Sequence, residues 1–337
     1  MVLSLQLGRP QKTVVRRQRR GLSMMMMSSE ALTAEKKVLV AFQGEPGAYS
    51  EEAAYQHFGE VDTLPCKSFD DVFAAVETGA ASYGMLPMEN SQAGSINKSY
   101  DLLMEYDLRV HGETVLRVHH SLLALTETES EKSLKKVRSH PQALAQCEGY
   151  LERHGLAIEA GSDTAGSARE ISEGKLLGVG AICSRLAAEK YAGLKVLATK
   201  IEDNKFNFTR FFVLGKGQTL QKIPDSKTSV VFAVSDKPGS LVKALLEFGR
   251  RNVNIIKLES RPRRSHANLG FQYIFYLDFQ GHHADPNCSA ALMGLLEECA
   301  FVKLLGSYEA APPIRFLYDS DTNKDGGVNL DPALMQI

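Results

Sequence analysis

Short apolar segments alternate with amphipathic segments between residues 38 and 193, and this alternation restricts the possible folds more than any other feature of the chain. Residues 38–42 and 84–88 are short, continuous apolar runs, which predict buried strands. Pro141 stands at a favoured first helical position, and one helix is expected from there to residue 153. Because strands and helices take turns along the chain, the sequence predicts an α/β domain.

A second group of elements follows the polar segment at 217–227. The residue pattern predicts helices that begin near 240 and 287, and strands at 228–235, 253–260, 270–279 and 302–305. The order βαββαβ is typical of a ferredoxin-like domain. We therefore expect a first domain at 37–216, a linker at 217–227, a second domain at 228–307 and an acidic, disordered tail at 308–337.

The charge and the cysteines exclude several classes of function. A net charge of -1 over 337 residues provides no global field that would attract nucleic acid or a membrane surface. No apolar run approaches the about 20 residues that a membrane span requires. The five cysteines show no paired spacing, which is typical of reduced thiols. No His- or Cys-based metal-ligand motif and no nucleotide-binding motif occurs, so we expect no metal and no cofactor. Residues 321–326 match only the first half of a calcium loop, because position twelve is Pro332 and not Glu.

The N-terminal segment differs in charge from the rest of the chain. Six basic residues and no acidic residue precede Glu30, and a leader of this kind is typical of an organellar transit peptide. Residues 1–36 are therefore expected to form such a leader. A merely disordered tail and a nuclear-type basic cluster at 16–20 are the alternatives.

Three turns place Gly, Ser or Thr directly before a predicted helix, at residues 44–50, 90–95 and 164–168. The unpaired N–H groups and the dipole at a helix start favour anions. One such turn is a weak signal, but three in one α/β unit predict a pocket for a small ligand that bears carboxylates. The candidate ligand-binding residues at these turns and at the 139–142 corner are Ser50, Gln142, Thr164, Ala165, Gly166 and Ser167. Asn90 and Ser91 are candidate catalytic residues.

A hydroxyl and a guanidinium stand side by side at the start of the apolar stretch 207–215. Neighbouring side chains on a strand point to opposite faces. Thr209 and Arg210 can therefore serve one site only if the strand is irregular there or if the site wraps its end. Ends of strands are where open α/β sheets bind ligands. Arg210 would hold a ligand carboxylate by charge-assisted hydrogen bonds, and an ion pair with a nearby acidic residue is its alternative role.

Four motifs in this order resemble those of the prephenate and arogenate dehydratases: Leu-Pro-Met-Glu-Asn-Ser at 86–91, Ser-His-Pro-Gln-Ala-Leu at 139–144, Asp-Thr-Ala-Gly-Ser-Ala at 163–168 and Asn-Phe-Thr-Arg-Phe at 207–211. The resemblance covers about residues 37–215. It implies a two-lobed, periplasmic-binding-protein-like catalytic domain with the active site between the lobes. It also implies that Thr209 is essential and that Phe211 belongs to the substrate-binding set.

The reaction that the resemblance implies fits these residues. Prephenate or arogenate loses carbon dioxide and a ring hydroxyl together, and this elimination requires no redox cofactor, metal or covalent nucleophile. Helix-start N–H groups would bind the two carboxylates of the substrate, while Thr209 stabilises the departing oxygen. A non-catalytic two-lobed binding protein or amino-acid sensor is the alternative hypothesis.

Whether prephenate or arogenate is the substrate stays open at the level of sequence. A plastid-type leader favours arogenate by analogy, because that activity is best represented in plastid lineages of the family. The expected location is then the plastid stroma, or the cytoplasm if residues 1–36 are not a transit peptide.

Two motifs of the second domain, Pro-Gly-Ser-Leu at 238–241 and Glu-Ser-Arg-Pro at 259–262, resemble the ACT regulatory domain attached to these dehydratases. The resemblance implies phenylalanine as the effector, bound between two copies of the domain, and hence a homodimer or homotetramer. A dimerisation module without an effector is the alternative. The expected effector-binding residues are Pro238, Gly239, Ser240, Leu241, Asn252, Asn254, Glu259, Ser260, Arg261 and Pro262.

Overall fold

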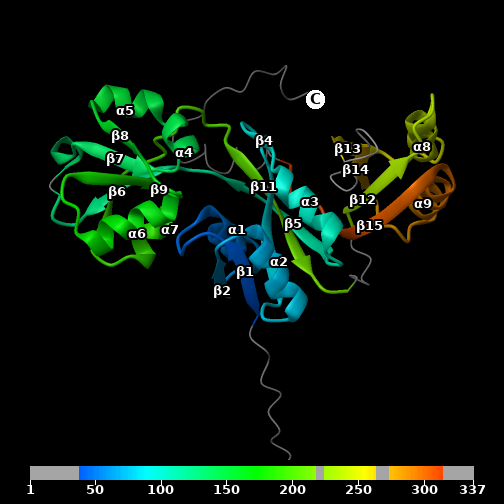
Figure 1. Cartoon of the computed structure of the whole chain (residues 1–337), viewed down its shortest axis with the longest axis horizontal. Helices are drawn as coiled ribbons and strands as arrows, with labels where there is room; N and C mark the ends of the chain where they lie inside the picture. Colours follow the sequence, from blue (N-terminus) through cyan, green and yellow to red (C-terminus); the bar gives the residue numbers. More distant parts are fainter. Residues whose placement is uncertain (1–37, 129, 218–223, 263–272, 314–337) are drawn as a thin grey trace, which may run out of the picture. The chain divides into compact units, whose positions relative to one another are not determined.

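The computed structural model describes residues 38–128, 130–217, 224–262 and 273–313 (Figure 1). The leader expected at 1–36, most of the linker expected at 217–227 and the tail beyond 313 lie outside the described residues. Three sheets organise the described residues, and each is covered by helices of its own.

The first lobe is built on a six-stranded mixed sheet. Its strand order is β2-β1-β3-β11-β5, with the short β4 beside β3. Strand β1 is parallel to β2 and β3, whereas β11 runs antiparallel to β3 and β5. The elements are β1 (Leu39–Gln43), α1 (Tyr49–Phe58), β2 (Asp62–Cys66), α2 (Phe69–Thr78), β3 (Tyr83–Asn90), β4 (Gly94–Ser95), α3 (Asn97–Glu105), β5 (Arg109–Arg117) and β11 (Phe208–Gly215).

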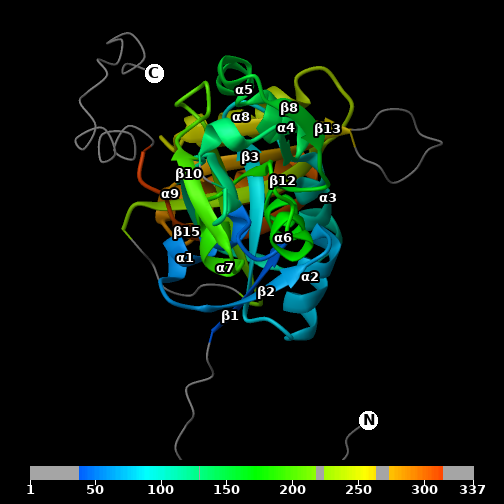
Figure 2. The same ribbon diagram turned by 90° about the vertical axis from the view of Figure 1, so that its left-hand side faces the viewer.

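The second lobe is built on a five-stranded sheet in the order β10-β6-β9-β7-β8. Helices α4 and α5 cover one face, and α6 and α7 cover the other (Figure 2). The elements are β6 (Ser121–Leu125), the 3-10 helix η1 (Glu131–Ser133), β7 (Lys136–Ser139), α4 (Pro141–Ala145), α5 (Glu148–His154), β8 (Ala157–Ala160), α6 (Thr164–Gly174), β9 (Val179–Cys183), α7 (Leu186–Lys190) and β10 (Leu194–Thr199).

The prediction of a single helix at 141–153 was wrong. The structure has two helices there, α4 and α5, separated at Gln146 and Cys147. The backbone N–H of Gln146 still bonds to the Gln142 carbonyl, which closes the last turn of α4. Cys147 then leaves the helical conformation with φ −123° and ψ 18°. The break leaves the Gln146 side chain at a helix end, where it can reach another part of the chain.

Two segments of chain join the lobes, at residues 118–120 and 200–207. They run beside each other, since Val118 N donates to Asn207 O at 2.7 Å and Ile201 N donates to His120 O at 3.1 Å. The first segment leaves β5 for the second lobe, and the second returns the chain to β11, which lies between β3 and β5 in the first sheet. Residues next to these segments therefore lie close to both lobes.

The C-terminal region forms a four-stranded antiparallel sheet in the order β13-β14-β12-β15. Its chain order βαββαβ confirms the ferredoxin-like prediction, although the last strand is longer than the expected 302–305. Both helices pack on one face of the sheet, against Val230, Phe232, Leu277 and Phe279. The elements are β12 (Ser226–Val234), α8 (Ser240–Gly249), β13 (Ile255–Pro262), β14 (Tyr273–Gln280), α9 (Pro286–Glu298) and β15 (Cys299–Glu309).

The other face of this C-terminal sheet shares a hydrophobic core with the first lobe. The rings of Phe212 and Tyr308 meet edge to face with centroids 5.6 Å apart. The Tyr276 hydroxyl donates to the Tyr100 carbonyl at 2.7 Å. The expected boundary between domains falls between β11 and β12, but the buried apolar cluster continues across it.

Candidate active site

The candidate site begins with two cross-strand pairs where β3 meets β11. Thr209 lies opposite Asn90, and Arg210 lies opposite Glu89. A register shift follows directly, between Arg210 and Phe211. Because neighbouring residues alternate between the faces of a sheet, the first pair and the second pair point in opposite directions.

The Asn90 amide has its orientation fixed by the backbone beside it. Its Oδ1 accepts from the N–H groups of Gln92 and Ala93, both at 3.0 Å. Its Nδ2 must then face the other way, where it donates to Thr209 Oγ1 at 3.0 Å and to Asn207 Oδ1 at 2.8 Å. Since Thr209 Oγ1 is an acceptor in this bond, its own proton remains to be donated to another partner.

A hydrogen-bond chain continues from Asn207 into the second lobe and back. Asn207 Nδ2 donates to Gln146 Oε1 at 3.1 Å, and His120 Nε2 lies 2.8 Å from the same oxygen. The amide oxygen can only accept, so we assign the histidine proton to Nε2. His120 Nδ1 is then the acceptor for the Tyr49 hydroxyl, at 2.6 Å.

Burial keeps the far end of this chain uncharged. His120 is 2% exposed, and desolvation lowers the pKa of its imidazole against the opposing influence of Gln146 and Glu202. Desolvation likewise raises the pKa of the Tyr49 phenol well above its usual value. Glu202 accepts from His120 N at 2.9 Å and binds His119 Nδ1 at 2.7 Å. The hydrogen-bond chain therefore fixes the positions of its side chains, and neither His120 nor Tyr49 adds a charge to it.

The helix starts predicted to bind carboxylates come from both lobes. Ser50 follows Tyr49 in the first turn of α1 and is buried. The turn before it contacts the second lobe twice: Ser184 Oγ donates to Gly47 O at 2.6 Å, and Arg169 lies 3.4 Å from Glu45. Arg169 belongs to α6, the helix whose first turn holds residues 164–167. The turn that precedes α1 is thus in contact with α6 through Glu45 and Arg169.

The remaining residues of the predicted set have different surroundings. Gln142 is exposed in the first turn of α4, one turn before Gln146. Ser91 Oγ donates to the Phe206 carbonyl at 2.9 Å and accepts from Phe208 N at 3.0 Å, so it ties the loop after β3 to the start of β11. Phe211 is 1% exposed within the first-lobe core. A contact between Phe211 and substrate stays a prediction.

Arg210 points away from Thr209 and is surrounded by protein carboxylates. Its guanidinium bonds to Glu89 and Glu113 at 2.9 Å each, and to Asp278 at 2.7 Å. Burial alone would raise the pKa of Glu89, but the charges of Arg210 and Lys257 bring that pKa below its usual value. This arrangement favours the ion-pair alternative for Arg210, and its binding of a substrate carboxylate stays a prediction.

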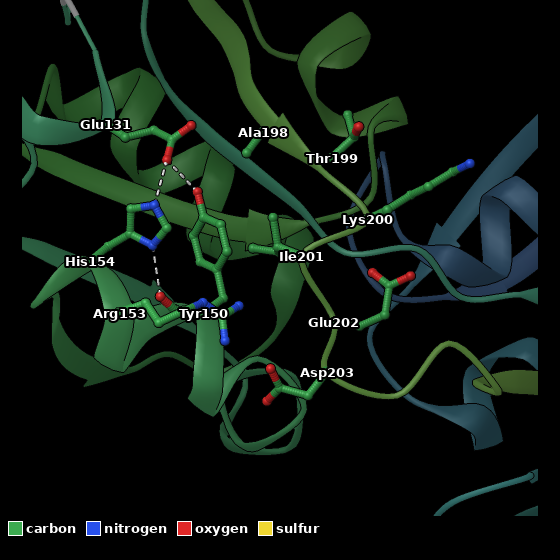
Figure 3. A pocket seen from close by; sticks show the side chains of 10 residues that line it. All are labelled: Glu131, Tyr150, Arg153, His154, Ala198, Thr199, Lys200, Ile201, Glu202 and Asp203. Carbon is green, nitrogen blue, oxygen red and sulfur yellow. Dashed lines mark hydrogen bonds and ion pairs between the residues drawn. The ribbon is translucent and has the colours of Figure 1, made fainter. Parts of the chain in front are cut away.

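Two cavities lie near these elements. One of about 280 Å³ opens on the Arg210 side of β11, and its lining includes Asn90 and Ser91 but not Thr209. The other, of about 430 Å³, lies in the second lobe and the returning segment (Figure 3). There Glu131 holds Tyr150 and His154, and none of the residues predicted for the site lines the cavity.

The described residues contain no group of three or more His, Cys, Asp or Glu side chains placed to hold a metal ion. Within the same ranges, no helix is both long enough and apolar enough to cross a membrane.

The residues predicted to bind the effector lie in three places: at the start of α8 and on the sheet face that α8 covers, on the opposite face of the sheet, and beyond the far end of α8. Gly239 adopts φ +83° as the N-cap of α8, a conformation that favours glycine. Ser260 is exposed on the same face of the sheet as α8, whereas Glu259 and Arg261 point to the opposite face, where they bond to first-lobe residues. Asn252 follows the far end of α8, which ten residues separate by about 15 Å from its start. One copy of the chain does not bring Gly239 and Asn252 together.

The protein has two α/β lobes joined by two connecting segments, and polar residues lie at the strand ends between the lobes. This arrangement defines a two-lobed, periplasmic-binding-protein-like α/β protein, which is followed by a ferredoxin-like domain. The family model described as prephenate dehydratase matches residues 40–219. The chain belongs to the prephenate dehydratase family, and it is a dehydratase of the carbon–oxygen lyase class.

Relatives and solved structures agree with this assignment. The chain is 42% identical to arogenate dehydratase 2 of Petunia hybrida, covering 83% of this chain and 74% of the relative. It is 43% identical to arogenate dehydratase/prephenate dehydratase 2, chloroplastic, of Arabidopsis thaliana, covering 83% and 75%. The prephenate dehydratase of Arthrobacter aurescens in complex with L-Phe is 32% identical, with a TM-score of 0.73 over 81% of this chain and 90% of that one.

One similar structure carries a different description. GqqA, described as a novel type of quorum quenching acylase, is 35% identical, with a TM-score of 0.75 over 82% of this chain and 99% of that one. The two-lobed fold expected from the sequence is confirmed by the prephenate dehydratase structures.

Sequence analysis missed most of the hydrogen-bond chain. His119 bonds to Glu202, whereas its neighbour His120 bonds to Gln146 and so joins the chain. Asn207 is the first residue of the motif at 207–211, so its position in the sequence marks it as a candidate. Gln146 and Tyr49 carry no signal of their own, because only the break between α4 and α5 and the contact between lobes bring them to this place.

Proposed function

We propose that this protein catalyses the decarboxylating dehydration of arogenate and prephenate, which yields phenylalanine and phenylpyruvate. The observation that carries the proposal is the hydrogen bond from Asn90 Nδ2 to Thr209 Oγ1. Because that bond occupies the oxygen as an acceptor, the threonine proton is directed to a different atom. A ring hydroxyl that leaves as hydroxide requires such a donor.

In the proposed reaction, the bond between the ring and its carboxylate breaks as carbon dioxide departs. Its electron pair completes the aromatic ring, and the ring C–O bond breaks at the same time. Thr209 stabilises the departing oxygen by its hydrogen bond, and the hydroxide leaves as water once protonated. The helix starts at Ser50 and at 164–167 would bind the substrate carboxylates, because their N–H groups and dipoles favour anions.

Thr209→Ala tests the role of the hydroxyl. We expect turnover to fall by a factor on the order of 10² to 10⁴, equivalent to about 3–5 kcal/mol of barrier, while substrate binding is largely kept. The measurement is kcat and KM from the ultraviolet absorbance of phenylpyruvate and the appearance of phenylalanine.

Thr209→Ser, which keeps the hydroxyl, is the matched control and should retain most of the turnover. A large loss of affinity at unchanged kcat would show that Thr209 binds substrate and does not assist departure. If the wild-type protein forms neither product, the binding-protein or sensor hypothesis replaces the enzyme.

We propose arogenate as the preferred substrate and the plastid stroma as the location. Support comes from relatives named arogenate dehydratase and from a relative described as chloroplastic. Residues 1–29, which contain six basic residues and no acidic residue, agree with such a location. Comparing kcat/KM for arogenate and prephenate on one preparation tests the preference, and a higher value for prephenate would reverse it.

We propose that the C-terminal domain is an ACT domain that binds phenylalanine and reduces activity by feedback. A relative whose solved structure contains L-Phe supports this proposal. The end of the domain where Gly239 begins α8 also carries the exposed Ser260, and helix-start N–H groups there suit the carboxylate of an amino acid. The expected assembly is a homodimer or homotetramer, in which a second copy would supply Asn252 and Asn254.

Ser260→Ala tests this effector site. We expect weaker inhibition by phenylalanine at unchanged kcat, because Ser260 lies on the face of β13 that points away from the first lobe. Inhibition curves and calorimetric titration with phenylalanine provide the measurement. Unaltered inhibition would place the effector elsewhere.

A further inference from the structure

A buried network of charges joins the first lobe to the C-terminal domain; we call it the charge seam. It consists of Glu89, Glu113 and Arg210 from the first lobe, with Lys227, Lys257 and Asp278 from the C-terminal domain. Lys227 lies 2.7 Å from Glu113, and Lys257 binds Glu89. Together with the three bonds of Arg210, these contacts connect all six side chains.

The charge seam occupies the opposite face of the two strands that carry the candidate catalytic pair. Glu89 directly precedes Asn90, and Arg210 directly follows Thr209. The two residue pairs are neighbours in one ladder, so they share backbone peptide groups. A backbone shift at Arg210 relative to Glu89 would therefore also shift Thr209 relative to Asn90.

Asp278 holds Arg210 from the C-terminal domain. Its Oδ2 accepts from the Arg210 guanidinium at 2.7 Å, and its Oδ1 accepts from Ser229 Oγ at 2.5 Å. The Asp278 side chain is 8% exposed and that of Arg210 is 11% exposed. Without the Asp278 charge, the buried network would hold three cations and two carboxylates, and Arg210 would be held by Glu89 and Glu113 alone.

We propose that Asp278 is a positioning residue for the dehydration: through Arg210, the C-terminal domain sets the geometry of Thr209 and Asn90. The proposal rests on the catalytic role proposed above for that pair. Asp278 lies far from Thr209 in sequence and belongs to a different sheet, so neither the family motifs nor strand periodicity would select it.

The charge seam also gives the effector a physical route to the site. On β13, Lys257 faces the first lobe and binds Glu89, and Glu259 accepts from Ser95 Oγ at 2.6 Å. Ser260 is exposed on the reverse face of the same strand. A ligand that shifts β13 from that face would move Lys257 and thereby Glu89, next to Asn90.

The test uses Asp278→Asn in the full chain. We expect kcat to fall by about tenfold to a hundredfold with KM changed by less than about threefold, because misplacement of a catalytic group affects turnover more than ground-state binding. Asp278→Glu, which keeps the charge, should recover part of kcat. Circular dichroism and thermal unfolding establish that each variant is folded.

Asp101→Asn is the matched control. Asp101 accepts from Arg261 at 2.9 Å across the same domain contact and is similarly buried, but it is not one of the six residues of the charge seam. We expect its kcat to stay within about twofold of wild type. Equal losses of kcat in Asp101→Asn and Asp278→Asn would overturn the proposal, because the effect would then be general loosening of the contact.

Lys257→Gln decides the matter if Asp278→Asn does not fold, since Lys257 is more exposed, at 19%. It should lower kcat with KM largely kept, and it should weaken inhibition by phenylalanine. Wild-type kcat in a folded Asp278→Asn, or in Lys257→Gln if only that variant folds, would refute the proposal while leaving the enzymatic function intact. Absence of turnover in the wild type would instead refute the proposed function.

Discussion

The side-chain amide of Asn90 sets the polarity of the candidate site. Two backbone N–H groups hold its oxygen, so its nitrogen faces Thr209 and Asn207. If the amide were reversed, its oxygen would face Thr209 Oγ1 and Asn207 Oδ1, and Thr209 would have to donate its proton to Asn90. The loop after β3 thus determines which way the threonine hydroxyl is used.

His120 gives the protein a dependence of stability on pH. Burial lowers the pKa of its imidazole in the folded protein, so the unfolded chain binds the proton more readily. The contribution of His120 to the free energy of unfolding should therefore be constant above about pH 6.5 and should fall as the pH decreases below that value.

Thermal unfolding of wild type and His120→Gln between pH 8 and pH 5 provides the measurement. Because the pKa values of His57, His111 and His283 are also lowered, only the difference between the two proteins reports on His120. The variant should lose less stability on acidification. Parallel curves would show that His120 does not titrate differently in the two states.

At the scale of elements, strand β15 approaches β5 so closely that one position admits only glycine. A Cβ added to Gly306 would lie 2.2 Å from the carbonyl oxygen of Val110. This close approach brings the C-terminal sheet against the first lobe and allows Tyr308 to reach Phe212.

Gly306→Ala should lower the free energy of unfolding by about 1–3 kcal/mol, because backbone atoms must move to admit the methyl group. Chemical denaturation gives the measurement. Gly249→Ala is the matched control: nothing lies within 4 Å of its added Cβ, and alanine favours a helix, so we expect no loss of stability. Similar stabilities for the two variants would contradict the contact between β15 and β5.

At the scale of the whole molecule, the C-terminal domain is part of one core with the first lobe. Tyr276 and Tyr308 lie in the same apolar cluster as Leu86 and Phe212. The charge seam crosses the same contact. A domain attached only by a linker would not share a core in this way.

A chain that ends at Gly217 should therefore be less stable than the full chain, with a lower midpoint of thermal unfolding and a tendency to aggregate. The truncation would expose the Phe212 and Tyr100 surface and would leave Arg210 without Asp278. Thermal unfolding and size-exclusion chromatography provide the measurement. A soluble, fully active and phenylalanine-insensitive product would show that the first two lobes are independent of the C-terminal domain.

The sequence by itself determined the elements and the family. Strand alternation, helix caps and the four motifs depend on residues a few positions apart, so the α/β order, the βαββαβ unit and the candidate Thr209 and Asn90 could all be predicted. Prediction from local pattern failed at residues 141–153, where the helical pattern of residue types continues but the helix is broken into α4 and α5.

Only the tertiary structure decided how those residues are used. The bond between Asn90 and Thr209 spans 119 positions, and that between Arg210 and Asp278 spans 68. Strand register placed Thr209 and Arg210 on opposite faces, and contacts between lobes recruited Gln146, His120 and Tyr49. Such contacts depend on how whole sheets pack, and no local pattern of residue types encodes that packing.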